Sequence, residues 1–596
     1  MSVNKRVVAV ALMAAACASP ATQPPATSPG PISQSQWVDS VMSSLSLRDK
    51  AAQMVWPTVL GDYTSGDSPQ WQRLTREVEQ GKVGGFTISV GSPTEVASKL
   101  NALQGMSSIP LIFGADLEAG AGFRARGGYF IPNAIDLGGA VVFPPEMAIG
   151  ATGDTVLAYE QGRLTAIEGR ALGIHVAYTP VLDVNNNPAN PVINTRSFGE
   201  DPAMVARLGA SFIRGIQDNG MIATGKHFPG HGDTGTNSHL ALPVVSVSRS
   251  RLDSVELVPF REAVRSGVGA IMTFHGAMPA LDSTGVPGTL SQKVMTGLLR
   301  NDLRFQGIII SDAMDMRGVL DQYGAVEAVK RAVAAGVDVL IQPLDVTQTV
   351  DAVVAGVAEG RYTEARLNES VRRILEAKAR LGLNRRKLVN LDSLRFIVGD
   401  SSHVRMARRI AERSITLVRD SASQIPLALG ANPRILSVTV GRRADLSAGL
   451  AFNATLRESA RSLTAAFLAA EDPAADYERL ERVADSMDVV IVSSYVGQNW
   501  DAVSASAPQA FAQFVQRLTA KGKRPIIVSF GNPYLLQQIP GVPAYVVAWG
   551  GFPLSQAAAA RALLGSQPIT GKLPISIPLE NSTVMRGSGL TRAASK

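Results

Sequence analysis

The chain has 596 residues, too many for one hydrophobic core, so two or more domains are expected. Charged residues make up 18% and hydrophobic residues 45% of the sequence, which excludes a largely disordered chain and a multi-span membrane protein. The formal net charge of +7 is small for this length and comes without a long run of lysine and arginine, so nucleic acid is not an expected partner.

The N-terminus resembles an export signal. A basic pair precedes an apolar run over residues 7–16, which is too short to span a bilayer but has the length of a signal-peptide core. The run ends at Cys17, the only cysteine, as in a bacterial lipoprotein signal; cleavage without lipidation is the alternative. We predict a signal peptide over residues 1–17 and a Pro/Ser/Thr-rich tether over residues 18–34. The protein would then be periplasmic or on the cell surface, anchored to a membrane by a lipid on Cys17.

Residues 35–390 alternate short apolar runs with segments long enough for helices. Eight runs are predicted to be strands, at residues 53–56, 83–90, 110–116, 176–183, 221–226, 270–275, 307–312 and 337–342. This is the rhythm of a (β/α)8 barrel. Polar residues fall at or just past the ends of these runs, on the face where barrel enzymes keep their active sites: Asp116, Asp183, Lys226, His275 and Asp312.

A second alternating region follows a break in the pattern near residue 390. We predict a linker over residues 391–404 and a C-terminal domain over residues 405–596. Its predicted strands are residues 434–440, 488–496, 525–530 and 544–549. The predicted fold class is α/β: an N-terminal (β/α)8 barrel of the TIM type, followed by a smaller α/β/α sandwich with a parallel sheet.

The segment KHFPGHGDTGTNSH, residues 226–239, is the most informative part of the chain. It holds three of the six histidines, and its proline and glycines exclude a helix. A lone buried histidine is most often structural, but a cluster on a loop after a strand indicates a functional site. A metal site is disfavoured, because the spacing of His227 and His231 suits two ligands only on a helix. No metal or cofactor is therefore expected.

Asp312 stands at the end of an apolar run that begins at Gly307. A carboxylate in this position can be a nucleophile, a base or a ligand, and the alternative is the cap of the following helix. Together with an imidazole on the same barrel face, it indicates nucleophilic displacement assisted by an acid and base.

These motifs resemble the β-N-acetylglucosaminidase, or β-N-acetylhexosaminidase, branch of glycoside hydrolase family 3. Besides the histidine segment, the resemblance rests on DLE at 116–118, NTRSFG at 194–199, TLS at 289–291 and ISDAMDM at 310–316. It extends from residue 35 to about residue 580. It implies that Asp312 is the nucleophile that forms a glycosyl-enzyme, and that His239 is the general acid and base of a retaining reaction.

The resemblance also implies roles for other side chains. Those that would hold the sugar are Asp116, Arg196, Lys226 and His227. Those predicted to support the site are Asn237, Asp233, His231 and His275. Asp183, His175 and His403 are predicted to be structural.

Asn237 departs from the family pattern, which has an aspartate two residues before the catalytic histidine. An amide can orient the His239 ring by a hydrogen bond but cannot stabilise an imidazolium by charge. We therefore expect a lower pKa for His239 and reduced activity, unless Asp233 or another carboxylate compensates.

Two alanines are further departures. Ala119 and Ala121 stand where the family usually has a glycine and a sugar-contacting arginine. Arg124 or Arg126 could supply the missing guanidinium.

The sequence thus predicts a retaining exo-hydrolase that releases terminal β-linked N-acetylglucosamine from peptidoglycan fragments or chitooligosaccharides. A β-glucosidase-type exo-hydrolase of the same family, with its acid in the second domain, stays open as an alternative. So does a catalytically inactive glycan-binding lipoprotein, because of Asn237. A histidine acid also leaves the site less negative than a second carboxylate would, which leaves phosphate open as an acceptor.

Overall fold

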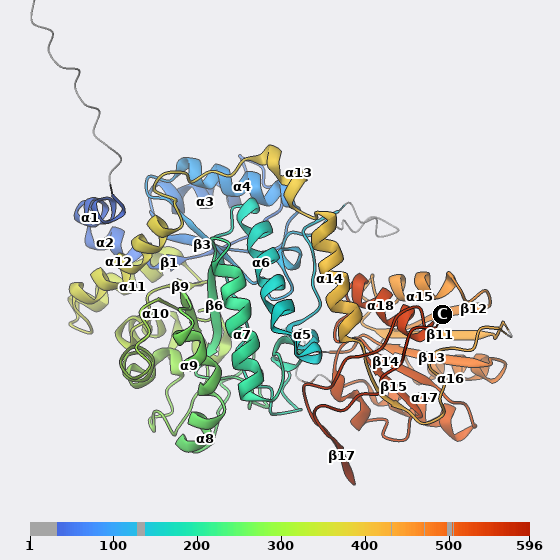
Figure 1. The fold of residues 1–596 in the computed structure, drawn as a ribbon. Coiled ribbons are helices and arrows are strands. Elements are labelled where there is room, and N and C mark those ends of the chain that lie inside the picture. The colour runs from blue at the N-terminus through green and yellow to red at the C-terminus, as the bar shows by residue number, and fades with distance from the viewer. Residues whose placement is uncertain are drawn as a thin grey trace, which may run out of the picture.

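The computed structural model describes residues 33–127, 138–430, 432–469, 471–497, 504 and 506–595. The predicted signal peptide, nearly all of the tether and the lipid site at Cys17 lie outside these residues. Figure 1 shows a barrel on the left and a second α/β body on the right, with helix α14 (Ser401–Ser414) along their junction. None of the helices in these ranges is both long and apolar enough to cross a membrane.

The barrel is built from parallel strands, and each of the eight predicted segments contains one. Strands β2 to β8 form a sheet in sequential order, β1 pairs with β9, and a bridge from Ile310 to Val339 joins the two sets. Strand β2 continues β1, so the ring closes as a TIM-type barrel. The strands are β1 (Val55–Trp56), β2 (Thr58–Val59), β3 (Gly85–Ile88), β4 (Ile112–Ala115), β5 (Val176–Ala177), β6 (Ile222–Phe228), β7 (Ala270–Thr273), β8 (Ile308–Ile310) and β9 (Leu340–Ile341).

Helices cover the outside of this ring, which is why β3, β4, β6, β7 and β8 are buried along their whole length. The longer ones are α1 (Gln34–Ser44), α3 (Pro69–Glu79), α4 (Pro93–Met106), α6 (Thr155–Leu172), α7 (Pro202–Gln217), α10 (Arg317–Ala335), α11 (Val346–Ala358) and α12 (Glu364–Arg380). Shorter ones are α2 (Leu47–Gln53), η1 (Ala121–Phe123), α5 (Glu146–Thr152), η2 (Asn194–Arg196), α8 (Arg249–Ser254), α9 (Leu257–Arg265), η3 (Gly288–Leu290) and η4 (Lys293–Asp302).

Local sequence sets the helix ends. Helix α6 begins after Asp154, whose carboxylate accepts the N–H of Val156 and Leu157, and it ends at Gly173 with φ of 90°. Helix α7 begins after Asp201 with Pro202 in its first turn, the usual place for proline.

The second domain contains a six-stranded sheet in the order β10-β15-β14-β13-β11-β12. Its strands are β10 (Thr416–Asp420), β11 (Ile435–Gly441), β12 (Leu463–Ala469), β13 (Val489–Ser494), β14 (Ile526–Ser529) and β15 (Ala544–Val547), and a hairpin of β16 (Ile577–Leu579) and β17 (Ser582–Val584) follows. The sheet is parallel, as predicted, except at one edge, where β10 pairs with β15 antiparallel. Strands β10 and β12 were missed. Most of β12 is exposed or half-buried at the other edge, so it lacks the apolar run of a central strand.

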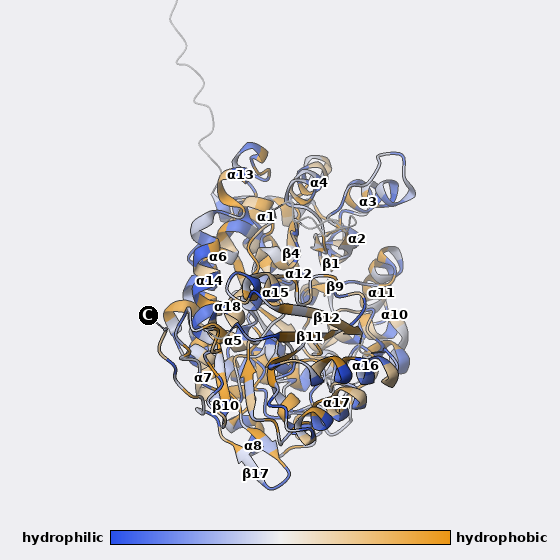
Figure 2. Ribbon diagram, turned by 90° about the vertical axis from the view of Figure 1, so that its right-hand side faces the viewer, coloured by the Kyte–Doolittle hydropathy of each residue, from blue (hydrophilic) through white to orange (hydrophobic). Residues whose placement is uncertain are grey.

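Helices cover both faces of this sheet, as the predicted α/β/α sandwich requires. One core lies between the sheet and α16 (Ala474–Asp485) and α17 (Gln509–Ala520); the other lies toward α14, α15 (Leu450–Arg457) and α18 (Pro553–Leu563). In Figure 2 β11 has apolar colours, whereas α16 and α17 carry hydrophilic residues. The remaining elements are η5 (Leu391–Ser393) and α13 (Leu394–Ile397), which lie in the predicted linker, and η6 (Pro533–Gln537).

Candidate active site

Most of the predicted site residues meet at the carboxyl ends of β4 to β8. Strand β6 runs to Phe228, so Lys226 and His227 lie in the last residues of the strand and not in the loop beyond it. Both side chains are buried. No helix forms between residues 229 and 241, as the proline and glycines of that segment predict.

Two carboxylates and three cations form an ion-pair cluster, which comprises Asp116, Glu118, Arg124, Arg196 and Lys226. Lys226 Nζ lies 2.8 Å from Asp116 Oδ1 and 2.7 Å from Glu118 Oε1. Arg196 donates to both oxygens of Glu118, at 2.9 and 2.7 Å, in the bidentate geometry that favours arginine. Arg124 Nη2 donates to Asp116 Oδ2 at 2.5 Å.

The two carboxylates of the cluster stay ionised near neutral pH. Burial alone would raise the pKa of Asp116 and Glu118, but the neighbouring cations outweigh it; the pKa of Asp116 falls well below its usual range and that of Glu118 falls to about 2. The same carboxylates raise the pKa of Lys226 against its burial. The arrangement presents fixed donors and acceptors, which suits hydrogen bonds to sugar hydroxyls.

His227 is oriented by the buried carboxylate of Asp183. The ring Nδ1 of His227 lies 2.8 Å from Asp183 Oδ2, and the same carboxylate accepts the backbone N–H groups of His227 and His231. A carboxylate only accepts here, so Nδ1 carries a hydrogen and Nε2 is left for other contacts. Asp183 therefore orients the His227 ring and holds the backbone at His227 and His231.

His231 shapes the loop. Its ring nitrogens contact Thr234 Oγ1 at 2.8 Å and Ser238 Oγ at 3.0 Å, and its ring lies 4.3 Å from that of Phe274. Burial and the neighbouring His227 lower the pKa of His231 to about 3, so the ring is neutral.

The two histidines that are predicted to be structural, His175 and His403, contact residues outside the ion-pair cluster. His175 Nδ1 accepts the N–H of Phe113 at 3.0 Å, and His403 Nδ1 lies 2.8 Å from Glu168 Oε1. Neither contact involves the ion-pair cluster or Asp312.

The backbone at Asp312 is held by a chain of hydrogen bonds. Its N–H donates to Thr273 Oγ1 at 3.1 Å, the hydroxyls of Thr273 and Thr289 are 2.7 Å apart, and Thr289 Oγ1 lies 2.7 Å from His275 Nδ1. His275 Nε2 lies 3.0 Å from the carbonyl of Ala313, which can only accept. Nε2 of His275 therefore carries a hydrogen, and the ring braces the residue after Asp312. Burial lowers the pKa of His275.

Asp312 is an ionised carboxylate. Burial would raise its pKa, but the nearby imidazoles of His227, His275 and His239 outweigh burial and lower it. The helix-cap alternative was wrong, because α10 starts at Arg317 and Met316 occupies the cap position without a side-chain bond.

His239 is oriented by Asn237. Asn237 Oδ1 accepts the backbone N–H of His239 at 3.0 Å and lies 3.0 Å from the ring Nδ1. Since that oxygen accepts, Nδ1 carries a hydrogen and Nε2 is the atom that can exchange a proton. Burial lowers the pKa of His239, while the charge of Asp312 partly offsets it. The effect of Asn237 on this pKa stays a prediction.

Asp233 does not take the place of the missing aspartate. Its carboxylate lies 3.9 Å from Arg251 Nη2, and burial raises its pKa. The carboxylates whose charge favours protonated His239 are those of Asp312 and Asp116. Asn237 is therefore the polar side chain that the structure places on Nδ1.

Comparison with known proteins places this site in a family. Residues 46–377 match the glycosyl hydrolase family 3 N terminal domain, and residues 318–592 match the glycosyl hydrolase family 3 C-terminal domain. The chain is 30% identical over 569 residues to a β-N-acetylglucosaminidase/β-glucosidase of Cellulomonas fimi, covering 90% of this chain and 95% of that protein. The chain belongs to glycosyl hydrolase family 3.

Further proteins resemble this family 3 hydrolase over most of its length. β-Hexosaminidase A of Pseudoalteromonas piscicida is 28% identical, covering 85% of this chain and 91% of that protein. A family 3 β-N-acetylglucosaminidase structure from Paenibacillus has a TM-score of 0.78 and 32% identity, covering 90% and 99% of the two chains. A β-glucoside phosphorylase structure has a TM-score of 0.79 and 25% identity, covering 91% and 95%.

Sequence reasoning missed several residues of the site of this hydrolase. Glu118 was seen only as part of DLE, although its position two residues after Asp116 was a signal. Thr289 was seen only as part of TLS, and Thr273 carried no signal of its own. Arg124, proposed as one replacement for the missing arginine, does contact Asp116, whereas Arg126 donates to the Phe123 carbonyl at 3.1 Å.

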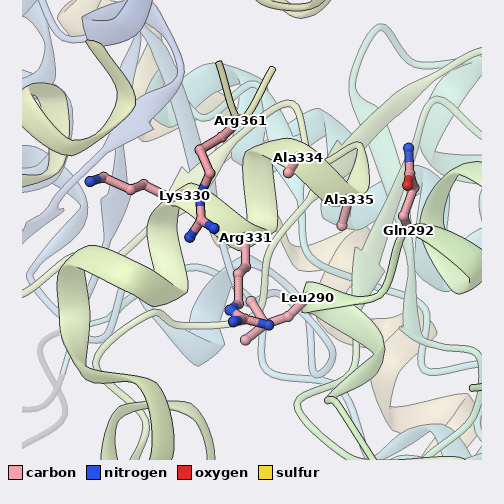
Figure 3. A pocket seen from close by; sticks show the side chains of 7 residues that line it. All are labelled: Leu290, Gln292, Lys330, Arg331, Ala334, Ala335 and Arg361. Carbon is pink, nitrogen blue, oxygen red and sulfur yellow. The ribbon is translucent and has the colours of Figure 1, made fainter. Parts of the chain in front are cut away.

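A cavity of about 260 Å³ lies apart from these groups (Figure 3). It is lined by the C-terminal part of α10, by Leu290 and Gln292 at the end of η3, and by Arg361 after α11. Its three cations are already paired: Lys330 lies 2.6 Å from Glu359, and Arg331 and Arg361 both contact Glu327, at 2.7 and 2.5 Å. It therefore lacks a free charge for a ligand. In the described part of the chain, no three His, Cys, Asp or Glu side chains are grouped to hold a metal ion.

Proposed function

We propose that this family 3 glycoside hydrolase releases terminal β-linked N-acetylglucosamine with retention of configuration. The observation that carries the proposal is the placement of two reactive groups at the carboxyl ends of barrel strands: Asp312 follows β8, and His239 lies on the loop after β6, where Asn237 orients its ring. The choice of N-acetylglucosamine as the sugar is supported by the names of two similar proteins, a β-N-acetylglucosaminidase/β-glucosidase and a β-N-acetylglucosaminidase.

In the first step, the carboxylate of Asp312 attacks the anomeric carbon while the bond to the leaving oxygen breaks. That oxygen takes the proton from His239 Nε2, and a glycosyl-enzyme ester forms. In the second step, water attacks the same carbon, gives its proton back to Nε2 and releases Asp312. A lowered pKa suits the second step, in which the neutral ring is the base, and weakens the first.

The ion-pair cluster would hold the sugar. Asp116, Arg196 and Lys226 offer charged acceptors and donors to its hydroxyls, and His227 would offer Nε2 because its Nδ1 is engaged by Asp183. Peptidoglycan fragments and chitooligosaccharides are the substrates we propose.

The test is release of nitrophenol from 4-nitrophenyl β-N-acetylglucosaminide beside the β-glucoside. Turnover of the N-acetyl substrate alone, with β-N-acetylglucosamine as the first product, is expected. Preference for the glucoside would instead identify a β-glucosidase-type enzyme and sink the proposal.

Phosphate is a second candidate acceptor, and Asn237 is the observation that favours it. The amide places no negative charge beside His239, so an anion meets less repulsion there than it would beside a carboxylate. The same assay with phosphate added distinguishes the two: N-acetylglucosamine 1-phosphate indicates phosphorolysis, and N-acetylglucosamine alone indicates hydrolysis.

We also propose export and a lipid anchor on Cys17, from the sequence pattern alone. Labelling of the wild type by a fatty acid, absent in Cys17→Ser, is expected. An unlabelled wild type found in the soluble fraction would refute the anchor.

A further inference from the structure

The second domain contacts the barrel at the loop after β5, residues 178–201. Asn185 Nδ2 donates to Tyr534 Oη at 2.9 Å, and Asn194 Nδ2 donates to Asn532 Oδ1 at 3.2 Å. All four side chains are buried. Buried hydrogen bonds are directional and costly to leave unmade, so these contacts define an orientation and do more than hold two surfaces together.

Each barrel asparagine is close in sequence to a residue of the site. Asn185 follows Asp183, the carboxylate that orients the histidines. Asn194 begins η2, the single turn that ends at Arg196. Ser197 Oγ donates to the carbonyl of Asp183 at 2.6 Å, which ties the two ends of the loop together. A shift of either asparagine would therefore move Asp183 or Arg196.

The second-domain side of the contact is itself held. Asn532 Oδ1 also accepts the N–H of Tyr534 at 3.0 Å, which caps η6. Ser529 Oγ donates to the carbonyl of Asn532 at 2.7 Å, and Tyr545 Oη donates to that of Pro533 at 2.9 Å. The segment is thus anchored to the ends of β14 and β15, and it can transmit the position of the second domain to the loop.

We propose that the segment 532–534 of the second domain is a positioning element for the sugar site. It acts through Asn194 on Arg196 and through Asn185 on Asp183, without touching the substrate. Arg196 forms an ion pair with Glu118, which in turn contacts Lys226. A displacement of Arg196 would therefore also shift the other groups that would hold the sugar. The proposal rests on the proposed function, because that function assigns Arg196 to sugar binding.

Two variants of the full chain test it. Tyr534→Phe removes the hydroxyl that accepts from Asn185, and Asn532→Ala removes the oxygen that accepts from Asn194. Arg413→Gln is the matched control: it breaks another junction contact, the 2.7 Å ion pair with Asp154 at the start of α6, on elements away from the loop. Tyr362→Phe controls for the loss of a buried, hydrogen-bonded tyrosine hydroxyl away from the loop, because Tyr362 Oη donates to the Val353 carbonyl at 3.0 Å.

The readouts are kcat and KM for 4-nitrophenyl β-N-acetylglucosaminide, and the calorimetric Kd for N-acetylglucosamine. Each test variant is expected to raise KM and Kd by about threefold to tenfold, the effect of one lost hydrogen bond, with kcat within about twofold. The controls should change Tm only. Test variants with a lowered Tm but wild-type KM and Kd would overturn the proposal.

Failure of the proposed function would look different. A wild type that binds N-acetylglucosamine but turns over no glycoside would contradict that function, and the Kd values of the variants would still decide the positioning role. A wild type without N-acetylglucosamine binding would overturn both.

Discussion

His227 and His239 lie on one connected segment, and both are oriented through Nδ1, but by different groups. The partner of His227 is the buried carboxylate of Asp183 at 2.8 Å, and the partner of His239 is the amide oxygen of Asn237 at 3.0 Å. Both oxygens select the tautomer with a hydrogen on Nδ1, and only the carboxylate adds a charge. At His239, the Nδ1 partner therefore provides orientation without a charge.

The largest effect is expected at Asp312, whose charge reaches both rings. Asp312→Asn should lower kcat/KM by at least about 10³-fold, because an amide cannot form the glycosyl ester. It should also lower the pKa of His239 further, since the carboxylate raises it. Kinetics and an NMR titration of His239 measure the two effects. Asp315→Asn, on the same loop, should stay within a few-fold of wild type; equal losses in both variants would contradict the nucleophile assignment.

Asp183→Asn gives His227 an amide partner like that of His239 and so removes the difference between the two rings. Asp183→Asn would bring an NH2 group toward the N–H groups of His227 and His231, so we expect a loss of about 10²-fold in kcat/KM and about 3 kcal/mol in the free energy of unfolding. Urea unfolding and steady-state kinetics at pH 7 measure them.

The stability loss in Asp183→Asn should depend on pH. The pKa of Asp183 is lowered from 3.8, because His227 and the N–H donors outweigh its burial. Its stabilisation is therefore complete above pH 3.8 and is lost as the pH falls through the lower folded value. The difference in the free energy of unfolding between wild type and Asp183→Asn should therefore become smaller below pH 3.8. A difference that becomes larger there would refute the role of the charge.

The reverse change, Asn237→Asp, gives His239 a carboxylate partner like that of His227. The acid role needs protonated His239, so kcat/KM should fall as the pH rises through a pKa that burial holds below 6.5. Asn237→Asp should raise this pKa by about one unit and the rate at pH 7 by about tenfold. The pH profile measures both. A variant no faster at any pH would show that charge on Nδ1 is not limiting, and Asn237→Ala, which loses orientation as well, should be slower throughout.

The smallest effect is expected from the brace behind Asp312. Thr289→Val keeps the shape but removes the hydroxyl between Thr273 and His275, so kcat should fall by about threefold to tenfold with little change in KM. The alkaline limb of the pH profile should not move, which separates this change from those at the imidazole partners. Thr296→Val, which loses a hydroxyl bond to the Ala335 carbonyl, is the control.

Much of the fold could be predicted from the sequence. Buried parallel strands appear as apolar runs, so each predicted run of the barrel falls on a strand, and only the two-residue strand β2 was missed there. The glycines and proline after Phe228 excluded a helix. Strand β10 was missed because Arg419 and Asp420 interrupt its short apolar stretch. Strand β12 was missed because a sheet edge needs little burial. The assignments of Asp312 as nucleophile and His239 as acid stay predictions.

The sequence by itself determined which reactive groups the chain carries, their order, and the strand ends on which they stand, because these depend on neighbouring residues. Only the tertiary structure decided their partners. Arg196 meets Glu118 across 78 residues, and Lys226 meets Asp116 across 110, because closure of the barrel brings the ends of β4 and β6 to one face. The same holds for Asn194 and Asn532, which are 338 residues apart and meet through the packing of two domains. Such contacts are set by closure and packing, for which local sequence has no periodic signal.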